Sequence, residues 1–179
     1  SEPLILIGVG AACVVFAFLY TTLLSYCGFG DVLVWVFFGF VPVAGTYYVE
    51  AGGFCREVWL LSAACGLLID TLLVLNNYRD REQDRLSGKR TLVVVLGERF
   101  GSLFYLLQGV AAYVLVAFMS FEGNLWLAIL PMLYLLPHYL TWRKMTQIRE
   151  GRALNRILGF TSRNMLTFAL LTAMALLAQ

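Results

Sequence analysis

The sequence predicts an all-α membrane protein, a bundle of six transmembrane helices, and two observations lead to this prediction. Of the 179 residues, 60% are hydrophobic and only 13% are charged, which is about half of the charged share in soluble domains. The apolar residues also form runs as long as a helix needs to cross a bilayer, about 20 residues. The composition therefore excludes an ordinary soluble domain, and the net charge of +2 gives no support for a nucleic-acid partner.

Six apolar segments can be drawn as membrane spans, and they leave almost no residues for a soluble domain. The second segment is short and contains Gly39, Pro42 and Gly45, so we expect a kink there. The third segment has Asp70 near its middle and runs into the most charged part of the chain. The six expected spans are 3–26, 32–49, 57–78, 99–119, 124–141 and 157–178.

The basic residues are concentrated in two clusters. Six of the 13 lysines and arginines lie between Arg79 and Arg99, and six more lie between Arg143 and Arg163. Two spans separate the clusters, so both lie on one side of the membrane, which the positive-inside rule makes the cytoplasmic side. The N-terminus then lies outside, which fits best if an odd number of spans precedes Ser1 in a longer protein.

The third span carries polar residues toward the cytoplasmic surface. Four of them fall within an arc of about 80° if the helix continues far enough: Asp70, Asn77, Asp80 and Asp84. An ionisable residue inside a span usually faces a cavity or a polar partner. Asp70 is therefore either a cavity-lining residue or a polar contact between packed helices.

Asp80 and Asp84 lie four positions apart, so both carboxylates project to one side of the helix. Mg²⁺ is often bound by one or two carboxylates together with substrate phosphates. Asn76 and Asn77 add neutral oxygens and amide donors. Cations suited to phosphate oxygens surround the pair: Arg79, Arg81, Lys89 and Arg90. The pattern indicates a Mg²⁺–diphosphate site, and a solvated helix end with ion pairs is the alternative that spacing leaves open.

The segment NNYRDREQDRLSGKRTLVVVLG, residues 76–97, resembles the second aspartate-rich motif of the UbiA superfamily of intramembrane prenyltransferases. The double Asn, the Arg-Asp, the second Asp four residues on and the GKRTL are most similar to the menaquinone-pathway branch, which prenylates 1,4-dihydroxy-2-naphthoate. VFFGFVPVAGTYY (36–48) and ALNRILGFTSRNMLTFALL (153–171) agree with that branch. The resemblance therefore extends over nearly the whole chain.

The resemblance implies a nine-helix fold around a cavity open to lipid, with residues 1–179 as one domain that supplies the last six helices. It implies that Asp80 and Asp84 bind Mg²⁺ and act in catalysis. The expected donor is a polyprenyl diphosphate, and the expected product is demethylmenaquinone, formed with loss of the carboxylate of the naphthoate. The residues expected to bind the diphosphate or the acceptor are Asn76, Asn77, Arg79, Lys89 and Arg90. Those expected to line the cavity are Phe38, Tyr47, Tyr48 and Asp70.

The family's first aspartate-rich motif has no counterpart in this sequence, which contains no second acidic cluster. We therefore expect the chain to be truncated at its N-terminus, or to depend on a separate chain that supplies the missing motif. Half of the metal–diphosphate clamp would then be absent, and the chain alone should not turn over. Mg²⁺-dependent prenyl transfer by the purified 179-residue chain would refute this. The charge bias and the family branch predict a bacterial inner membrane, with the active-site mouth facing the cytoplasm.

Two other functions are compatible with parts of the sequence. A related prenyltransferase acting on 4-hydroxybenzoate, homogentisate or haem would use the same acidic pair. A transporter or a non-catalytic membrane scaffold would use Asp70 as an ion or proton site, but it should also show inverted repeats and a polar path across the bilayer. The sequence shows no such repeat. His138 has no His partner and is interpreted as a packing or interfacial residue rather than a base.

Overall fold

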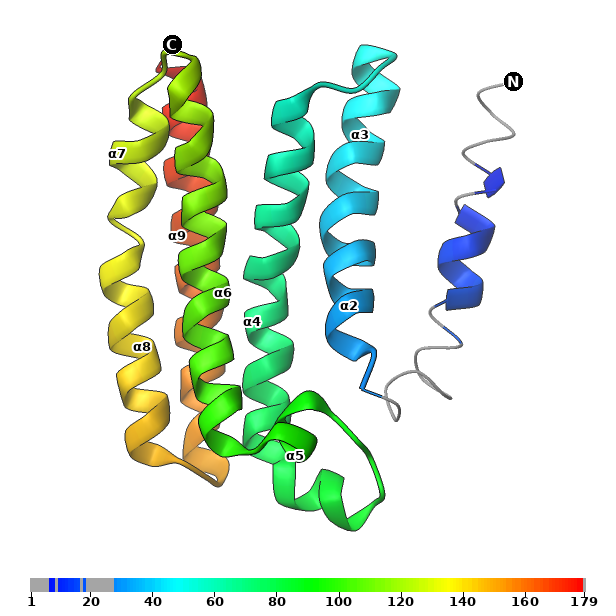
Figure 1. Ribbon diagram of the computed structural model, residues 1–179, viewed down its shortest axis with the longest axis vertical. Helices are drawn as coiled ribbons and strands as arrows, with labels where there is room; N and C mark the ends of the chain where they lie inside the picture. Colours follow the sequence, from blue (N-terminus) through cyan, green and yellow to red (C-terminus); the bar gives the residue numbers. More distant parts are fainter. Residues whose placement is uncertain (1–6, 9, 17, 19–27, 179) are drawn as a thin grey trace.

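The computed structural model describes residues 7–8, 10–16, 18 and 28–178, and the regular elements of this part of the chain are helices. They run side by side along the long axis of the molecule (Figure 1). Four are long and apolar enough to cross a membrane: Gly30–Ala51, Arg56–Leu86, Glu98–Phe121 and Arg152–Leu177. These match the second, third, fourth and sixth predicted spans. Much of the first predicted span, 3–26, lies outside the described residues, although residues 10–16 are helical.

The second span consists of three consecutive segments: α2 (Gly30–Val34), the π-helical η2 (Trp35–Phe40) and α3 (Val41–Ala51). Pro42 has no N–H to donate to the carbonyl of Phe38, as a regular α-helix would require. The thiol of Cys65, in the next helix, approaches that carbonyl at 3.8 Å. The irregularity that the sequence predicts around Pro42 therefore takes the form of wider π-helical turns just before the proline.

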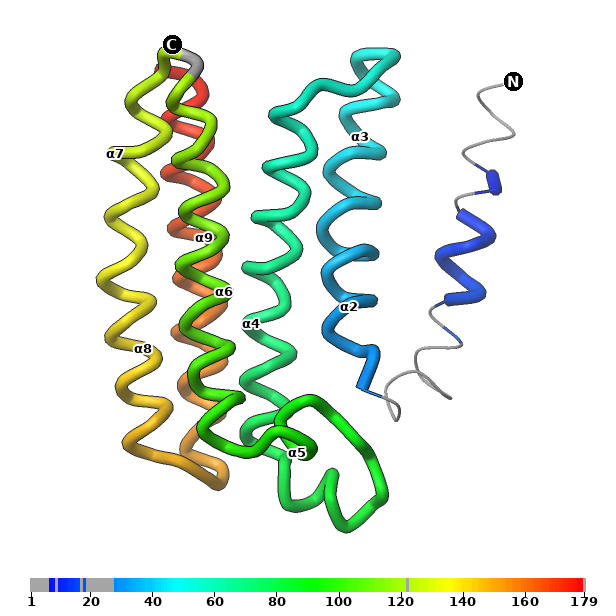
Figure 2. Tube along the Cα trace, in the orientation of Figure 1, coloured from blue at the N-terminus to red at the C-terminus, as the bar shows by residue number. Residues whose placement is uncertain are grey.

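The third span is a single helix, α4 (Arg56–Leu86), whose 31 residues continue past the predicted membrane segment. The second span packs along one side of α4, and two glycines allow the backbones to approach closely (Figure 2). A Cβ atom on Gly39 would lie only 2.6 Å from Cα of Gly66. Beside this contact, the indole N–H of Trp35 donates to the carbonyl of Ala63 at 3.0 Å.

The remaining elements are α5 (Leu92–Leu96), α6 (Glu98–Phe118), the 3₁₀ turn η3 (Met119–Glu122), α7 (Trp126–Met132), α8 (Leu135–Ile148), the 3₁₀ turn η4 (Arg152–Leu154) and α9 (Asn155–Leu177). On the other side of α4 lie α6 and α9, and α7 and α8 pack against these two helices. The short α5 contacts α4 and α6, and the sixth span begins with η4. The fifth predicted span, 124–141, is divided between α7 and α8, which follow one another along the bundle (Figure 1). Pro131 and Pro137 lie on either side of this break, and neither has the N–H that a continuous helix needs.

Two apolar clusters fill the bundle, and buried polar side chains pair across the helices. Toward the end of α4 the cluster consists of Val74, Leu75, Tyr78, Val93, Tyr105, Met145, Leu154 and Ile157. The hydroxyl groups of Tyr105 and Thr161 lie 2.8 Å apart, and the amide of Asn164 donates to the hydroxyl of Thr141 at 2.8 Å. These bonds satisfy polar groups that would otherwise be costly to bury.

His138 is a packing residue, as the sequence predicts. Its buried ring stacks on the rings of Tyr105 and Tyr134, with centroids 5.0 and 5.1 Å away. Gly109 on α6 makes room for it, because a Cβ atom there would lie 2.2 Å from Nε2 of His138.

Candidate functional site

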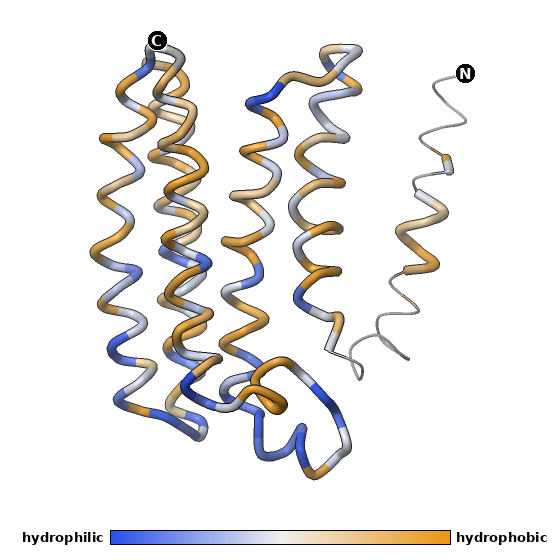
Figure 3. The backbone as a smooth tube through the Cα atoms, viewed as in Figure 1, coloured by the Kyte–Doolittle hydropathy of each residue, from blue (hydrophilic) through white to orange (hydrophobic). Residues whose placement is uncertain are grey.

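Polar residues gather at one end of the bundle, where α4 ends and the connection between α8 and η4 lies (Figure 3). The two basic clusters predicted to share one side of the membrane are in direct contact there. Nη1 of Arg81 donates to the carbonyl of Arg149 at 2.7 Å, and Nη1 of Arg79 donates to Oδ1 of Asn155 at 2.9 Å. The structure therefore confirms that the two clusters lie at the same end of the molecule.

Asp84 lies near the end of α4, and only 9% of the residue is exposed. Its Oδ1 is 3.5 Å from Nζ of Lys89, and its backbone carbonyl accepts the N–H of Lys89 at 2.9 Å. Its Oδ2 is buried and has no hydrogen-bond partner among the described residues. Buried carboxylate oxygens normally have partners, and an orphaned carboxylate oxygen suits a hard cation such as Mg²⁺.

Asp80 lies one helical turn before Asp84 and is more accessible. Both of its oxygens accept hydrogen bonds from the neighbouring Arg79, at 2.7 Å from Nε and at 2.6 Å from Nη2. The third contact of this guanidinium is with Asn155, at the first position of α9. Arg79 therefore connects one carboxylate of the acidic pair to the sixth span.

The acidic pair lies on a continuous helix, as the proposed i, i+4 spacing requires. Because α4 continues to Leu86, Asp80 and Asp84 lie one turn apart on one regular helix, and each is within electrostatic range of the other. The described residues contain no group of three or more His, Cys, Asp or Glu side chains that could hold a metal. Two carboxylates fit Mg²⁺ as a partial ligand set in which phosphate oxygens complete the coordination.

The two asparagines before the pair have different environments. Asn77 is buried and lines a small cavity of about 10 Å³ together with Lys89, whereas Asn76 is half-buried and Arg90 is exposed. Asp31, from α2, also lines this cavity, and its Oδ1 is buried without a partner among the described residues. The sequence analysis does not include Asp31 among the site residues, although an acidic residue at the start of an apolar span often has a functional role.

The four residues expected to line a cavity lie in separate places. Tyr47 lines a cavity of about 1300 Å³ at the opposite end of the bundle from the acidic pair. Tyr48 stacks on Phe54 with ring centroids 5.1 Å apart, and Phe38 is 57% exposed. Asp70 is buried in the bundle, where Nε2 of Gln108 donates to its Oδ2. The structure therefore does not bring these four residues together around the acidic pair.

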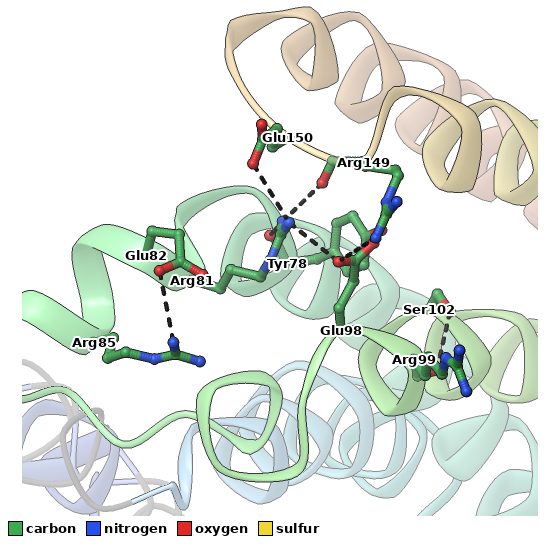
Figure 4. Close-up of polar contacts among 9 residues, drawn as sticks. All are labelled: Tyr78, Arg81, Glu82, Arg85, Glu98, Arg99, Ser102, Arg149 and Glu150. Atoms are coloured by element: carbon green, nitrogen blue, oxygen red, sulfur yellow. Dashed lines mark hydrogen bonds and ion pairs between the residues drawn. The ribbon is translucent and has the colours of Figure 1, made fainter.

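A network of polar side chains joins α4, α6 and the connection between α8 and η4 (Figure 4). Nη1 of Arg81 donates to the carbonyls of Tyr78 at 2.8 Å and Arg149 at 2.7 Å. Its Nη2 lies 3.3 Å from Oε2 of Glu98 and 3.8 Å from Oε2 of Glu150. Arg81, which the sequence offers as a cation for phosphate, is thus engaged in holding three parts of the fold together.

Glu98, at the first position of α6, is the centre of this network. Its Oε1 accepts hydrogen bonds from the hydroxyl of Tyr78 and from Nε of Arg149, both at 2.9 Å. The hydrogen bond to Glu98 and the negative charge of this carboxylate raise the pKa of the Arg149 guanidinium. Arg149 has a φ of 65°, a backbone conformation that non-glycine residues rarely adopt. Its contacts therefore fix a sharp turn after α8.

Comparison with known proteins gives a family and several relatives. The chain matches the UbiA prenyltransferase family over residues 3–166. It is 37% identical to the 1,4-dihydroxy-2-naphthoate octaprenyltransferase of Mycobacterium leprae over 180 residues. This aligned region covers 96% of this chain and 58% of that protein. It is also 37% identical over 135 residues to the Haemophilus influenzae protein of the same name, covering 70% of this chain and 44% of that protein. A 2-carboxy-1,4-naphthoquinone phytyltransferase of Synechocystis is 28% identical over 94 residues, covering 52% of this chain and 31% of that protein.

The chain spans 58% of the length of the Mycobacterium leprae protein and 44% of that of the Haemophilus influenzae protein, or about half. No solved structure matches it. The family match extends over most of the chain and includes the acidic pair on α4. With four apolar helices of membrane-spanning length, this makes the chain part of an integral membrane protein. The chain belongs to the UbiA prenyltransferase family.

Proposed function

We propose that the protein containing this chain transfers a polyprenyl group from polyprenyl diphosphate to 1,4-dihydroxy-2-naphthoate. The direct product is demethylmenaquinol, the reduced form of the demethylmenaquinone that the family resemblance implies. The observation that carries the proposal is the orphaned Oδ2 of Asp84, one helical turn from Asp80 at the polar end of an apolar bundle. Family membership supports prenyl transfer. The names of the relatives support a polyprenyl donor and a naphthoate acceptor.

In this proposal Asp80 and Asp84 hold Mg²⁺ through their carboxylate oxygens, and the diphosphate of the donor completes the coordination. Bound there, Mg²⁺ would offset part of the diphosphate charge and make it a better leaving group. Lys89, 3.5 Å from Asp84, and Arg79, beside Asp80, are the cations nearest to the phosphate oxygens. The amide of Asn77 and the exposed Arg90 are assigned to the same diphosphate, with Asn76 as a neighbouring support.

The reaction breaks the C–O bond between the prenyl group and its diphosphate and forms a C–C bond to a ring carbon of the acceptor. The carboxylic acid group of the acceptor leaves as carbon dioxide and a proton, so that the ring becomes aromatic again. Cationic character develops on the allylic carbon as the C–O bond lengthens, and water would capture it. The role that we assign to the apolar bundle beside the acidic pair is therefore to keep water away from that carbon.

The 179 residues supply one acidic pair, and we propose that a second acidic motif outside them completes the diphosphate clamp. The concentration of Lys and Arg at the end of the bundle that carries the pair supports a site facing the cytoplasm. These two relatives come from bacteria, which supports a location in the bacterial inner membrane.

A product assay tests the proposed reaction. Membranes containing the protein expressed from its complete gene, in a host without its own enzyme of this kind, are incubated with a polyprenyl diphosphate and 1,4-dihydroxy-2-naphthoate. We expect a prenylated product whose mass shows the loss of carbon dioxide, formed with Mg²⁺ and abolished by a chelator. In competition with an equal concentration of 4-hydroxybenzoate, the naphthoate product should predominate. A product that keeps its carboxyl group, or a preference for 4-hydroxybenzoate, would contradict the proposal.

A further inference from the structure

Arg79 forms a bridge between the acidic pair and α9. Its Nε and Nη2 donate to Oδ1 and Oδ2 of Asp80 at 2.7 and 2.6 Å, and its Nη1 donates to Oδ1 of Asn155 at 2.9 Å. A fork-shaped, two-bond contact of this kind is the strongest that a guanidinium makes with a carboxylate. Asn155 is the only partner of this guanidinium, among the described residues, that lies outside α4.

This contact opposes the binding of a metal cation at Asp80. A positive guanidinium already lies against both carboxylate oxygens, and a second cation there would be repelled by it. For Asp80 to give its full charge to a metal, Arg79 has to turn away and keep a favourable partner elsewhere. The side chain of Asn155 already holds one of the guanidinium nitrogens and can retain it after Asp80 is released.

The surroundings allow this movement and keep Asn155 in place. A cavity of about 600 Å³ lies at this end of the bundle and is lined by Arg79, Asp80 and Asn155, so the guanidinium has space to turn. Leu154, the residue before Asn155, is fully buried in the core. The start of α9 is therefore fixed relative to α4 while the side chain of Arg79 moves.

We propose that Asn155 is a positioning residue that draws Arg79 away from Asp80 when the metal and diphosphate bind. The inference rests on the proposed function, because it assumes that Asp80 is a metal ligand. It assigns Asn155 no contact with the reacting atoms. Its effect passes through Arg79, which moves from the carboxylate toward the arriving phosphate oxygens while Nη1 stays with Asn155.

The inference predicts opposite effects for two substitutions of similar size. In Asn155→Asp the new carboxylate competes with Asp80 for Arg79, so the metal should bind more tightly. In Asn155→Leu the guanidinium loses its alternative partner and stays on Asp80, so the metal should bind more weakly. Because the contact between Arg79 and Asn155 is exposed, we expect each change in affinity to be about threefold.

Direct binding of Mn²⁺, used in place of Mg²⁺, measures this without turnover. Free Mn²⁺ is followed by electron paramagnetic resonance during titration of the purified protein, expressed from its complete gene, in the presence of inorganic diphosphate. Gln83→Leu is the matched control, because Gln83 lines the same cavity, and it should bind Mn²⁺ like the wild type.

Each outcome supports or overturns a specific claim. Tighter binding by Asn155→Asp together with weaker binding by Asn155→Leu supports the positioning role. Affinities for both variants equal to the wild type, or weaker binding by Asn155→Asp, overturn it. If Asn155→Leu cannot be purified, the sign of the change in Asn155→Asp decides alone. Wild-type binding by Asp84→Ala in the same experiment would instead overturn the metal site of the proposed function.

Discussion

Arg79 and Arg81 are two residues apart on α4, but they have different partners. Arg79 holds Asp80 at the edge of a cavity, whereas only 9% of Arg81 is exposed and its guanidinium binds the carbonyl of Arg149 and the carboxylate of Glu98. A buried guanidinium is stable only when its donors are engaged. Arg81 therefore stabilises the fold at this end of the bundle, whereas Arg79 belongs to the candidate site.

Replacement of Arg81 should destabilise the protein. Arg81→Leu removes the hydrogen bonds to two backbone carbonyls and the contact with Glu98, so we expect the free energy of unfolding to fall by about 2–4 kcal/mol. Unfolding by a denaturing detergent, starting from mixed micelles, measures this.

Arg85→Leu is the control, because Arg85 is 62% exposed and its contact with Glu82 is an ion pair of 3.7 Å. That change should cost at most about 1 kcal/mol. Equal losses of stability for Arg81→Leu and Arg85→Leu would show that the Arg81 network does not hold the fold.

The sequence predicts that this stretch is charged and forms the end of a helix, but not which arginine is structural. Spacing on α4 treats Arg79 and Arg81 alike, because both are next to Asp80. Their roles are set by Glu98 and by the carbonyl of Arg149, which lie in other parts of the chain. Asp31 was missed for the same reason, since its proximity to Asn77 depends on how α2 packs on α4.

At the scale of elements, η2 and α4 pack closely because Gly39 and Gly66 have no side chains. A Cβ atom on Gly66 would lie 2.6 Å from the carbonyl oxygen of Trp35 and 2.3 Å from its ring. Distances this short to backbone atoms cannot be relieved by a rotamer change. Any side chain at Gly66 therefore has to separate the second span from α4.

Gly66→Ala should lower the apparent melting temperature of the detergent-solubilised protein, with a loss of stability of about 1–3 kcal/mol. Gly45→Ala, in α3, is the matched control, because a Cβ atom there meets no atom within 4 Å. Alanine favours helix over glycine by up to about 1 kcal/mol, so this control should be neutral or stabilising. A Gly66→Ala protein that melts at or above the wild-type temperature would contradict the packing described for α4.

Helix positions were largely predictable from hydrophobicity, because four of the six expected spans match helices of membrane-spanning length. The break between α7 and α8 was not predicted, although Pro131 and Pro137 were visible in the sequence. A proline in a membrane helix is often tolerated when neighbouring groups satisfy the freed carbonyls. Its effect therefore depends on neighbouring groups whose positions the spacing of the sequence does not give.

At the scale of the whole molecule, charge and apolar surface are separated along one axis. The apolar lengths of the helices form the bundle, and hydrophilic residues gather at one end (Figure 3). The last turns of α4 carry the acidic pair and Arg81, and Lys89 pairs with Asp84. The sequence predicted this separation because the two basic clusters are an even number of spans apart. Of the four residues expected to line a cavity, Tyr47 lines one at the opposite end of the bundle from the acidic pair. Spacing does not place the four relative to the acidic pair, because a cavity is defined by how the helices pack.

The central claim is that Asp80 and Asp84 hold Mg²⁺ and the donor diphosphate for prenyl transfer. The most direct test is the Mg²⁺-dependent rate of prenyl transfer for Asp80→Ala, Asp84→Ala and Glu82→Ala in the protein expressed from its complete gene. Glu82 lies between the two aspartates, but its side chain is 63% exposed and contacts Arg85. Each aspartate variant should lose at least about a hundredfold in rate with normal expression, since a metal ligand is removed, while Glu82→Ala stays near the wild-type rate. Near-normal transfer by Asp80→Ala or Asp84→Ala would contradict the claim.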